Sequence, residues 1–235
     1  MNKAKTALCC ALVLIFLAVI AYSGYRIAGI QADYRQEAAM RREVIAYRPE
    51  PMPDTVNQSV IDLQAEYPDV AGWVSVPNTG IDYPFVWYRD NDYYLRRDLN
   101  GDHAMAGTIF MDFRCNKDFT SRNTVLYGHH MKNGSMFGTL KAFGDESFFN
   151  ENGHGTIYLP QETLTLTFFA YMVINPGIEK EIYNASLSDT YFDYVKQNAR
   201  HYRDVELTES DRIVTLSTCA YEFDNARMVL LGKVM

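Results

Sequence analysis

The segment IVTLSTCAYEFDNARMVLLGKV, residues 213–234, contains two runs of apolar and β-branched residues separated by a polar stretch. The first run ends at Cys219 and the second begins at Arg227. Such runs predict strands, and the short connection 220–226 predicts an antiparallel pair, with Asp224 as a turn residue. Cys219 and Arg227 would then lie side by side at the turn end of the pair. This segment therefore predicts both β structure and a candidate site.

Further short runs of the same kind precede this pair. A helix is predicted over 58–66, and a helical spacing of apolar residues predicts another over 190–202. Turn signals stand at 78–80 and 152–153. The remaining predicted strands cover 72–76, 81–86, 108–113, 124–127, 156–159 and 164–174. About eight short strands with few helices indicate a mainly β protein, either a closed barrel or a sandwich, and we favour the barrel.

The N-terminal stretch is apolar. Residues 7–25 carry no charge, and at ~1.5 Å per residue they are long enough to cross a ~30 Å hydrocarbon core. A cleaved signal peptide is the alternative, but its apolar region would be shorter, and 21–23 is a poor cleavage match. We expect residues 1–6 to form a cytoplasmic tail and 7–25 an uncleaved anchor. Lys3 and Lys5 before the span place the rest of the chain outside the cell.

Behind the span, residues 31–47 are rich in helix formers and charge, and 48–53 contain three prolines. We therefore expect 26–56 to be a juxtamembrane helix or stalk with a Pro-rich linker. The folded domain then covers 57–235. The formal net charge of −7 argues against nucleic acid as a partner, because phosphate binding needs clustered cations.

The chain has four cysteines, of which Cys9 and Cys10 lie in the apolar run. Cys115 and Cys219 remain, either as a disulfide or with Cys219 as a single reactive thiol. Two features favour the thiol: the adjacent Arg227, which would favour thiolate, and the paired histidines 129–130, which could exchange protons near neutral pH. A buried structural cysteine is the commoner fate of an isolated thiol.

Other kinds of active site lack their motifs. The sequence has no H-E-x-x-H, no C-x-x-C, no Gly-rich phosphate loop and no G-x-S-x-G. A papain-type site needs a histidine well downstream of its cysteine, and none follows His201. We therefore expect neither a metal nor a cofactor.

Three motifs resemble those of the sortases, and of class B in particular. Thr215-Leu-Ser-Thr-Cys219 matches the family's T-L-x-T-C signature, and Tyr127-Gly-His-His130, followed by Met136-Phe137, matches the histidine segment of class B. Arg227 falls at the family's arginine. The resemblance runs from about residue 61 to 235 and includes 72–73, 91–95, 107–114 and the helical insertion at 190–203.

This resemblance implies an eight-stranded β-barrel and a transpeptidation. The Cys219 thiolate would cleave a C-terminal sorting signal, of an Asn-Pro-x-Thr type or a variant, after its Thr. An amine of the cell wall would then resolve the thioester, which joins the secreted protein to peptidoglycan. His129 would be the general acid and base, with His130 as its rival, and Arg227 would hold the oxyanion.

For substrate contacts, the resemblance implies Asn91 and Leu95 in the groove, Ser217 two residues before the nucleophile, and Tyr183 as the loop tyrosine that closes the groove. Two alternatives stay open. One is a pilin-polymerising sortase, less favoured because those enzymes usually carry an N-terminal lid and a second, C-terminal span. The other is an inert membrane-tethered barrel that only binds peptides.

Overall fold

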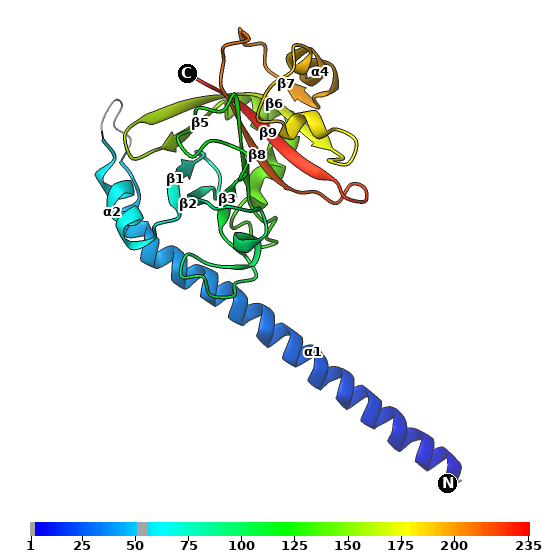
Figure 1. Ribbon diagram of the computed structural model, residues 1–235. Coiled ribbons are helices and arrows are strands. Elements are labelled where there is room, and N and C mark those ends of the chain that lie inside the picture. The colour runs from blue at the N-terminus through cyan, green and yellow to red at the C-terminus, as the bar shows by residue number, and fades with distance from the viewer. Residues whose placement is uncertain (1–2, 51–55) are drawn as a thin grey trace.

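Eight strands close into a barrel, as predicted (Figure 1). The computed structural model describes residues 3–50 and 56–235. The strands of the ring follow in the order β5 (His154–Tyr158), β1 (Val70–Ser75), β2 (Asp82–Trp87), β3 (Ile109–Met111), β4 (Asn123–Tyr127), β8 (Ile213–Cys219), β9 (Arg227–Val234) and β6 (Thr163–Ile174). The last strand of the ring, β6, pairs back with the first, β5, which closes the barrel. The short strand β7 (His201–Tyr202) pairs with β6 at Ala170 and Tyr171.

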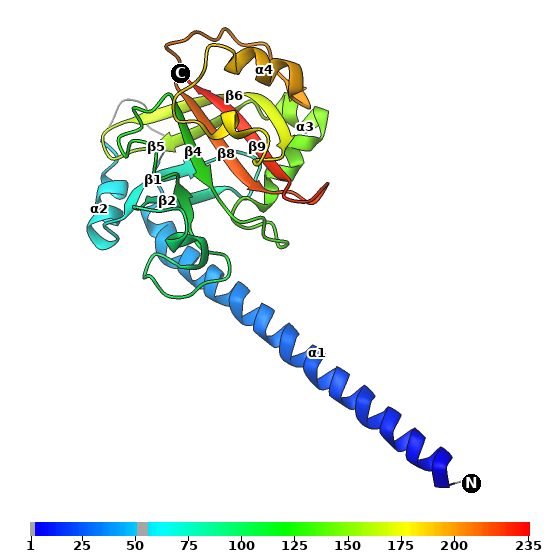
Figure 2. The ribbon, with the colours of Figure 1, turned by 45° about the vertical axis from the view of Figure 1, so that its right-hand side comes forward.

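The predicted strand pair at the end of the chain is present. β8 and β9 lie side by side (Figure 2) and are antiparallel, and their register pairs Cys219 with Arg227. On its other edge β8 lies parallel to β4, so that Tyr127, the last residue of β4, pairs with Ser217. The end of β4, which leads into the paired histidines, therefore lies beside the end of β8 that carries the cysteine.

Each of the eight predicted strands overlaps an observed strand, with ends shifted by a few residues. The prediction missed β7, because two residues are too short to show an alternation of apolar and polar side chains. The predicted helix over 190–202 is too long. Helix α4 is Tyr191–Asn198, and Ala199 has extended backbone. The chain leaves the helix there because Arg200 and Arg203 donate backbone hydrogen bonds to β6 on either side of β7.

Short helices fill the connections. Helix α2 (Gln58–Glu66) is confirmed and buries Val60 and Leu63. Helix α3 (Glu146–Glu151) is capped by Asp145, whose side chain accepts from the Phe148 amide at 2.9 Å. The short 3₁₀ helices are η1 (Ile45–Tyr47), η2 (Tyr93–Arg96), η3 (Gly138–Gly144) and η4 (Lys180–Tyr183).

The two faces of β8 show how the barrel positions a site. Because side chains alternate along a strand, Val214 and Leu216 point into the main core. Ile213 lies on the outer face and joins a second apolar cluster, formed with η4 and α4. The same outer face carries Ser217, which is buried, and then Cys219, which is partly exposed. The apolar cluster on the outer face of β8 therefore ends before Cys219, which is left partly exposed.

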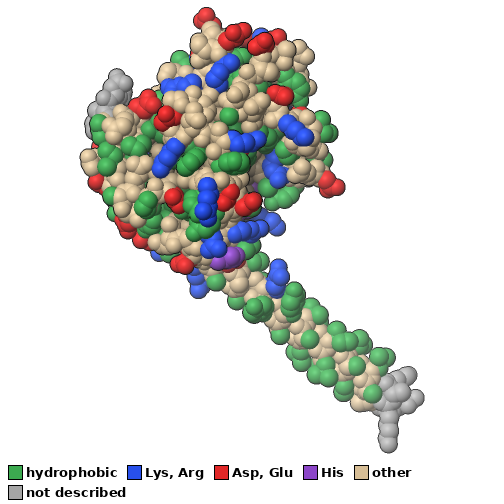
Figure 3. All heavy atoms as spheres, viewed as in Figure 1, with side chains coloured by type: hydrophobic (Ala, Val, Ile, Leu, Met, Phe, Trp, Pro, Cys, Tyr) green, Lys and Arg blue, Asp and Glu red, His purple; other side chains and the backbone are tan. Residues whose placement is uncertain are grey.

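Helix α1 (Lys3–Val44) extends away from the barrel as one continuous helix of 42 residues (Figures 1 and 2). Its described apolar part is exposed and has a mean hydropathy of 2.5 in its most apolar window, enough in length and composition to cross a membrane (Figure 3). The predicted stalk differs in one respect: the end of α1 packs against the barrel, where Glu37 and Val44 are buried. Half of the Pro-rich stretch 48–53 lies outside the described residues.

Candidate active site

A cavity of about 220 Å³ opens on the outer face of the barrel, where β4, β8 and β9 meet. Six of the seven predicted site residues line it, and Tyr183 does not. The full lining consists of Asn91, Leu95, Phe110, Tyr127, Gly128, His129, Ser217, Thr218, Cys219 and Arg227.

The cysteine and the arginine are held by the turn between β8 and β9. The Ala220 amide donates to the Ala226 carbonyl at 2.9 Å, and Asn225 takes the left-handed conformation with φ 62°. This conformation is accessible to Asn because its short polar side chain can hydrogen-bond locally. Arg227 Nη1 donates to the Ala226 carbonyl at 3.0 Å. Within residues 3–50 and 56–235, no carboxylate forms a salt bridge with Arg227, so no anionic side chain neutralises its charge.

The two histidines make different contacts. His129 Nε2 lies 2.7 Å from the Leu95 carbonyl, and His130 Nδ1 lies 2.8 Å from the Cys219 carbonyl. A carbonyl only accepts hydrogen bonds, so both of these nitrogens must carry protons. In the neutral imidazole, His129 Nδ1 is then the atom that can gain a proton. His129 lines the cavity, whereas His130 packs against Tyr221 with ring centroids 5.3 Å apart.

Burial lowers the pKa of His129 below its ordinary value. The hydrogen bond to Leu95 acts in the opposite direction, and the nearby positive charge of Arg96 lowers the pKa further. The neutral imidazole is therefore the favoured form of His129 near neutral pH.

Gly107 is needed for the backbone that holds His129. It has φ 58°, and a Cβ there would lie 2.6 Å from the Leu95 carbonyl oxygen, the atom to which His129 donates. We expect Gly107→Ala to lower the free energy of unfolding by about 2 kcal/mol, because an L side chain is strained at positive φ and would also clash with backbone. Urea unfolding of the two proteins measures the difference.

The matched control is Gly144→Ala, because a Cβ at Gly144 would lie 3.5 Å from the Tyr171 ring, an ordinary contact. We expect that change to stay within about 0.5 kcal/mol. Equal losses in the two variants would contradict a special role for the Gly107 backbone.

Asn91 and Leu95 reach the cavity from the connection between β2 and β3. Asp90 accepts from the amides of Asp92 and Tyr93, which starts η2, and Asn91 Oδ1 accepts from the Phe113 amide at 3.0 Å. Both predicted groove residues therefore line the cavity and are held by backbone contacts.

Tyr183 does not line the cavity but contacts Ser217, a residue that does. Its side chain is buried, and its hydroxyl is 2.9 Å from Ser217 Oγ. Burial raises the pKa of Tyr183 to about 12. Tyr183 therefore holds a residue of the groove through the Ser217 hydroxyl, and its role in closing the groove stays a prediction.

The sequence analysis missed a polar network behind Tyr127. Its hydroxyl donates to Asp112 at 2.9 Å, and Arg114 donates to both carboxylate oxygens of Asp112. Burial alone would raise the pKa of Asp112, but hydrogen bonds from Arg114 and Tyr127 bring it below its usual value. Asp112 directly follows the short buried strand β3, and a carboxylate at such a position with an arginine two residues later is a sequence signal for this pair.

Cys115 is a free buried thiol, not a disulfide partner of Cys219. Its Sγ lies 3.3 Å from the Asn123 carbonyl, and burial raises its pKa to about 11. A thiol this difficult to ionise is a poor nucleophile near neutral pH.

Comparison with known proteins agrees with this site. A family model described as the sortase domain matches residues 74–235. Sortase B of Listeria monocytogenes is 32% identical, and the alignment covers 99% of each chain. The crystal structure of sortase B from B. anthracis in complex with AAEK1 matches with a TM-score of 0.77 and 32% identity, over 87% of this chain and 98% of that one. A Streptococcus pyogenes class B sortase involved in pilus biogenesis matches with a TM-score of 0.69 and 29% identity, over 74% and 97%.

The closed barrel and these matches define a β-barrel protein of the cysteine transpeptidase type. The chain belongs to the sortase family, in class B.

Proposed function

We propose that this chain cleaves a C-terminal sorting signal on secreted proteins and transfers them to an amine of the cell wall, with Cys219 as nucleophile. The observation that carries the proposal is the register of β8 and β9, which pairs Cys219 with Arg227 in a cavity that His129 also lines. An inert binding barrel has no need to bring these three side chains together.

The first half of the reaction forms a thioester. The Cys219 thiolate attacks the carbonyl carbon of the Thr in the sorting signal, and Arg227 stabilises the oxyanion that develops. The carbon–nitrogen bond then breaks, and protonated His129 gives its proton to the leaving amine. The free Nδ1 is the position for this proton, because Nε2 is bonded to Leu95.

The second half reverses these roles. An amine of the wall precursor attacks the thioester carbon, neutral His129 takes its proton, and the carbon–sulfur bond breaks to restore the thiolate. The product is an amide bond between the secreted protein and the wall. Because burial disfavours the protonated imidazole, the pair of thiolate and imidazolium is a minor population, and turnover is slow.

Asn91, Leu95 and Ser217 are the proposed contacts of the sorting signal, and all three line the cavity. The proposed signal is of an Asn-Pro-x-Thr type or a close variant, as the resemblance of the motifs to class B implies. Tyr183 acts on this groove through its hydrogen bond to Ser217.

The apolar part of α1 is the proposed anchor. Its exposed face and hydropathy support insertion into a bilayer, with Lys3 and Lys5 on the cytoplasmic side and the barrel on the extracellular face.

A polymerising role is the second candidate, favoured by one observation. The S. pyogenes relative is a class B sortase involved in pilus biogenesis. In that case the second substrate would be a lysine of another subunit. A wall amine and a lysine-bearing protein, supplied separately as acceptors, distinguish the two functions.

The pH profile of kcat/KM should report the lowered pKa of His129. Since Arg96 contributes to that lowering, Arg96→Gln should raise the pKa of His129 and move the acid limb of the profile to higher pH. The shift should shrink at high salt because Arg96 is exposed. Measuring kcat/KM against pH, with and without added salt, checks both points.

The matched control is Arg97→Gln, the same loss of charge one residue further on. Its guanidinium stacks on the Tyr93 ring, with 4.9 Å to the ring centroid, and is not among the groups that shift the pKa of His129. An acid limb that moves equally in both variants, or in neither, would contradict the assignment to His129.

The function is tested with the full chain in detergent micelles and a library of fluorogenic sorting peptides, with and without amine acceptors. We expect cleavage of one peptide class and formation of an amide product when the acceptor is present. Failure to cleave any peptide, together with no selective alkylation of Cys219, would favour the inert binding barrel.

A further inference from the structure

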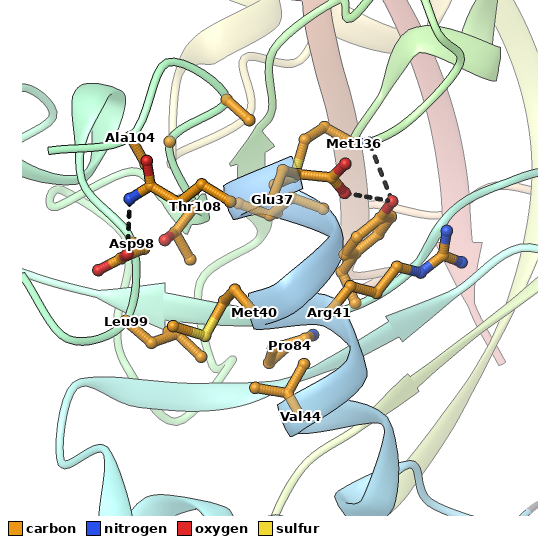
Figure 4. Close-up of a pocket in the computed structure, with 15 residues that line it drawn as sticks. Glu37, Met40, Arg41, Val44, Pro84, Asp98, Leu99, Ala104, Thr108 and Met136 are labelled. Carbon is orange, nitrogen blue, oxygen red and sulfur yellow. Dashed lines mark hydrogen bonds between the residues drawn. The ribbon is translucent and has the colours of Figure 1, made fainter. Parts of the chain in front are cut away.

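The end of helix α1 contacts both chain segments that hold His129. One segment contains Leu95, whose carbonyl accepts from the imidazole, and continues to Thr108. The other contains His129 itself and continues to Phe137. Figure 4 shows this end of α1 against the barrel, with Glu37 facing Met136. A small cavity of about 40 Å³ lies between α1 and the barrel at this point.

The histidine segment closes on itself at Met136. The Phe137 amide donates to the His129 carbonyl at 3.0 Å, and Met136 forms a β-bridge with His130. Met136 has φ 51°, a left-handed conformation that a long side chain rarely adopts. Such a conformation persists only where the surroundings hold it.

Tyr83 of β2 provides the hold. Its hydroxyl accepts from the Met136 amide at 3.2 Å and makes a long contact of 3.5 Å with Glu37 Oε1. The guanidinium of Arg41 lies 4.8 Å from the centroid of the Tyr83 ring. Glu37 and Arg41 of α1 therefore contact Tyr83, and Tyr83 in turn holds the backbone of Met136.

Glu37 is an unusual residue for this position, because only 8% of it is exposed. Burial raises its pKa, while the charge of Arg41 and the polar side chains of Ser135, Tyr83 and Asn133 partly offset that effect. Ser135 and Asn133 belong to the histidine segment, so the carboxyl group lies among polar side chains of that segment. A buried carboxyl group is costly unless such contacts compensate for the loss of water.

Gln36 of α1 contacts the segment that runs from Leu95 to Thr108. Its Nε2 donates to the His103 carbonyl at 3.0 Å and to Asp98 Oδ2 at 3.3 Å. Thr108 ties the ends of this segment together, because its amide donates to the Tyr94 carbonyl next to Leu95.

We propose that the Tyr83 hydroxyl, held between Glu37 of α1 and the Met136 amide, positions the histidine segment for proton transfer by His129. This inference rests on the proposed function. Tyr83 is a positioning residue that acts through the backbone of residues 129–137, and it touches no reacting atom. Since α1 continues into the apolar span, the proposed anchor is rigidly connected to the histidine of the site.

The test compares Tyr83→Phe with Tyr67→Phe in the full chain in detergent micelles. Tyr67 is the matched control. Its hydroxyl also donates to a carboxylate of α1, that of Glu43, at 2.9 Å, but Tyr67 lies beside α2. We expect Tyr83→Phe to lower kcat about tenfold with KM unchanged, because a misplaced proton donor affects the transition state. Tyr67→Phe should leave kcat within about twofold, and thermal unfolding is measured for both.

Variants at residue 37 complete the experiment. Glu37→Gln keeps an acceptor for Tyr83 and should retain kcat, whereas Glu37→Leu should lower it as Tyr83→Phe does. The double variant Glu37→Leu with Tyr83→Phe should be no slower than either single variant, because both remove one connection. Equal kcat in Tyr83→Phe and Tyr67→Phe, or fully additive losses in the double variant, would overturn the inference.

A second readout needs no substrate. The imidazole resonances of His129, followed by NMR, should shift in Tyr83→Phe and stay in place in Tyr67→Phe. If the wild type cleaves peptides and these resonances do not respond, the inference fails while the proposed function stands. If the wild type cleaves nothing and the resonances do respond, the positioning contact stands while the proposed function fails.

Discussion

Replacing Cys219 with Ala is expected to abolish cleavage of sorting peptides, a loss of at least about 10⁴-fold in kcat/KM. The thiol sulfur is the atom that bonds to the acyl group, and Ala offers no substitute for it. The barrel should be unaffected, because Cys219 is partly exposed at the end of β8. Cleavage of the fluorogenic peptide and a thermal unfolding curve, recorded on the same preparation, separate lost chemistry from lost structure.

Cys115→Ala provides the control. It removes the other thiol of the barrel, which is buried against the Asn123 carbonyl and has its pKa raised to about 11. We expect this variant to keep its activity and to lose only stability, by about 1–2 kcal/mol for a small buried side chain. Activity in Cys219→Ala, or its disappearance in Cys115→Ala, would show that the nucleophile has been assigned to the wrong residue.

Replacing His129 with Ala should lower kcat/KM by about 10³-fold, and the same change at His130 by about tenfold or less. His129 lines the cavity with Cys219 and Arg227 and keeps Nδ1 free, which suits a proton carrier. His130 uses its own Nδ1 to hold the backbone carbonyl of Cys219, so its loss should displace the nucleophile without removing the acid.

The two adjacent variants serve as controls for each other, since they delete the same side chain from neighbouring positions. Peptide cleavage at several pH values is the measurement, and the acid limb should disappear only in His129→Ala. The reverse order of losses would assign proton transfer to His130 and would contradict the present mechanism.

The hairpin of residues 213–234 could be predicted because its determinants are local. Two alternating apolar runs and a seven-residue connection fix the register, and the register alone places Cys219 beside Arg227. The position of His129 was harder to predict from the local pattern of apolar and polar residues. It depends on the parallel pairing of β4 with β8, a contact between segments far apart in the sequence. The family motif supplied that expectation, and the structure agrees with it.

Other features could not be predicted, for physical reasons. The contact of Tyr183 with Ser217 could not be predicted, because it forms where η4 packs on the outer face of the barrel, which no periodicity in residues 174–184 indicates. Helix α4 ends at Asn198, because the backbone of 200–203 bonds to β6. The packing of α1 on the barrel was also missed, because the face that contacts the barrel carries the charged Glu37 and Arg41 beside Met40 and Val44, so it does not show as an apolar stripe in the sequence. Tertiary contacts override local propensity at each of these places.

The central claim is a covalent acyl-enzyme on Cys219, and its mass tests the claim most directly. The full chain is mixed, in the absence of amine, with an intact sorting peptide of the class that it cleaves. The reaction is quenched in acid, and the protein is analysed intact and after digestion. We predict an added mass equal to that of the free peptide acid ending at Thr less one water, located on Cys219 and removed by an amine acceptor. An adduct on another residue, or cleavage with no trapped adduct under conditions where deacylation is slow, would contradict it.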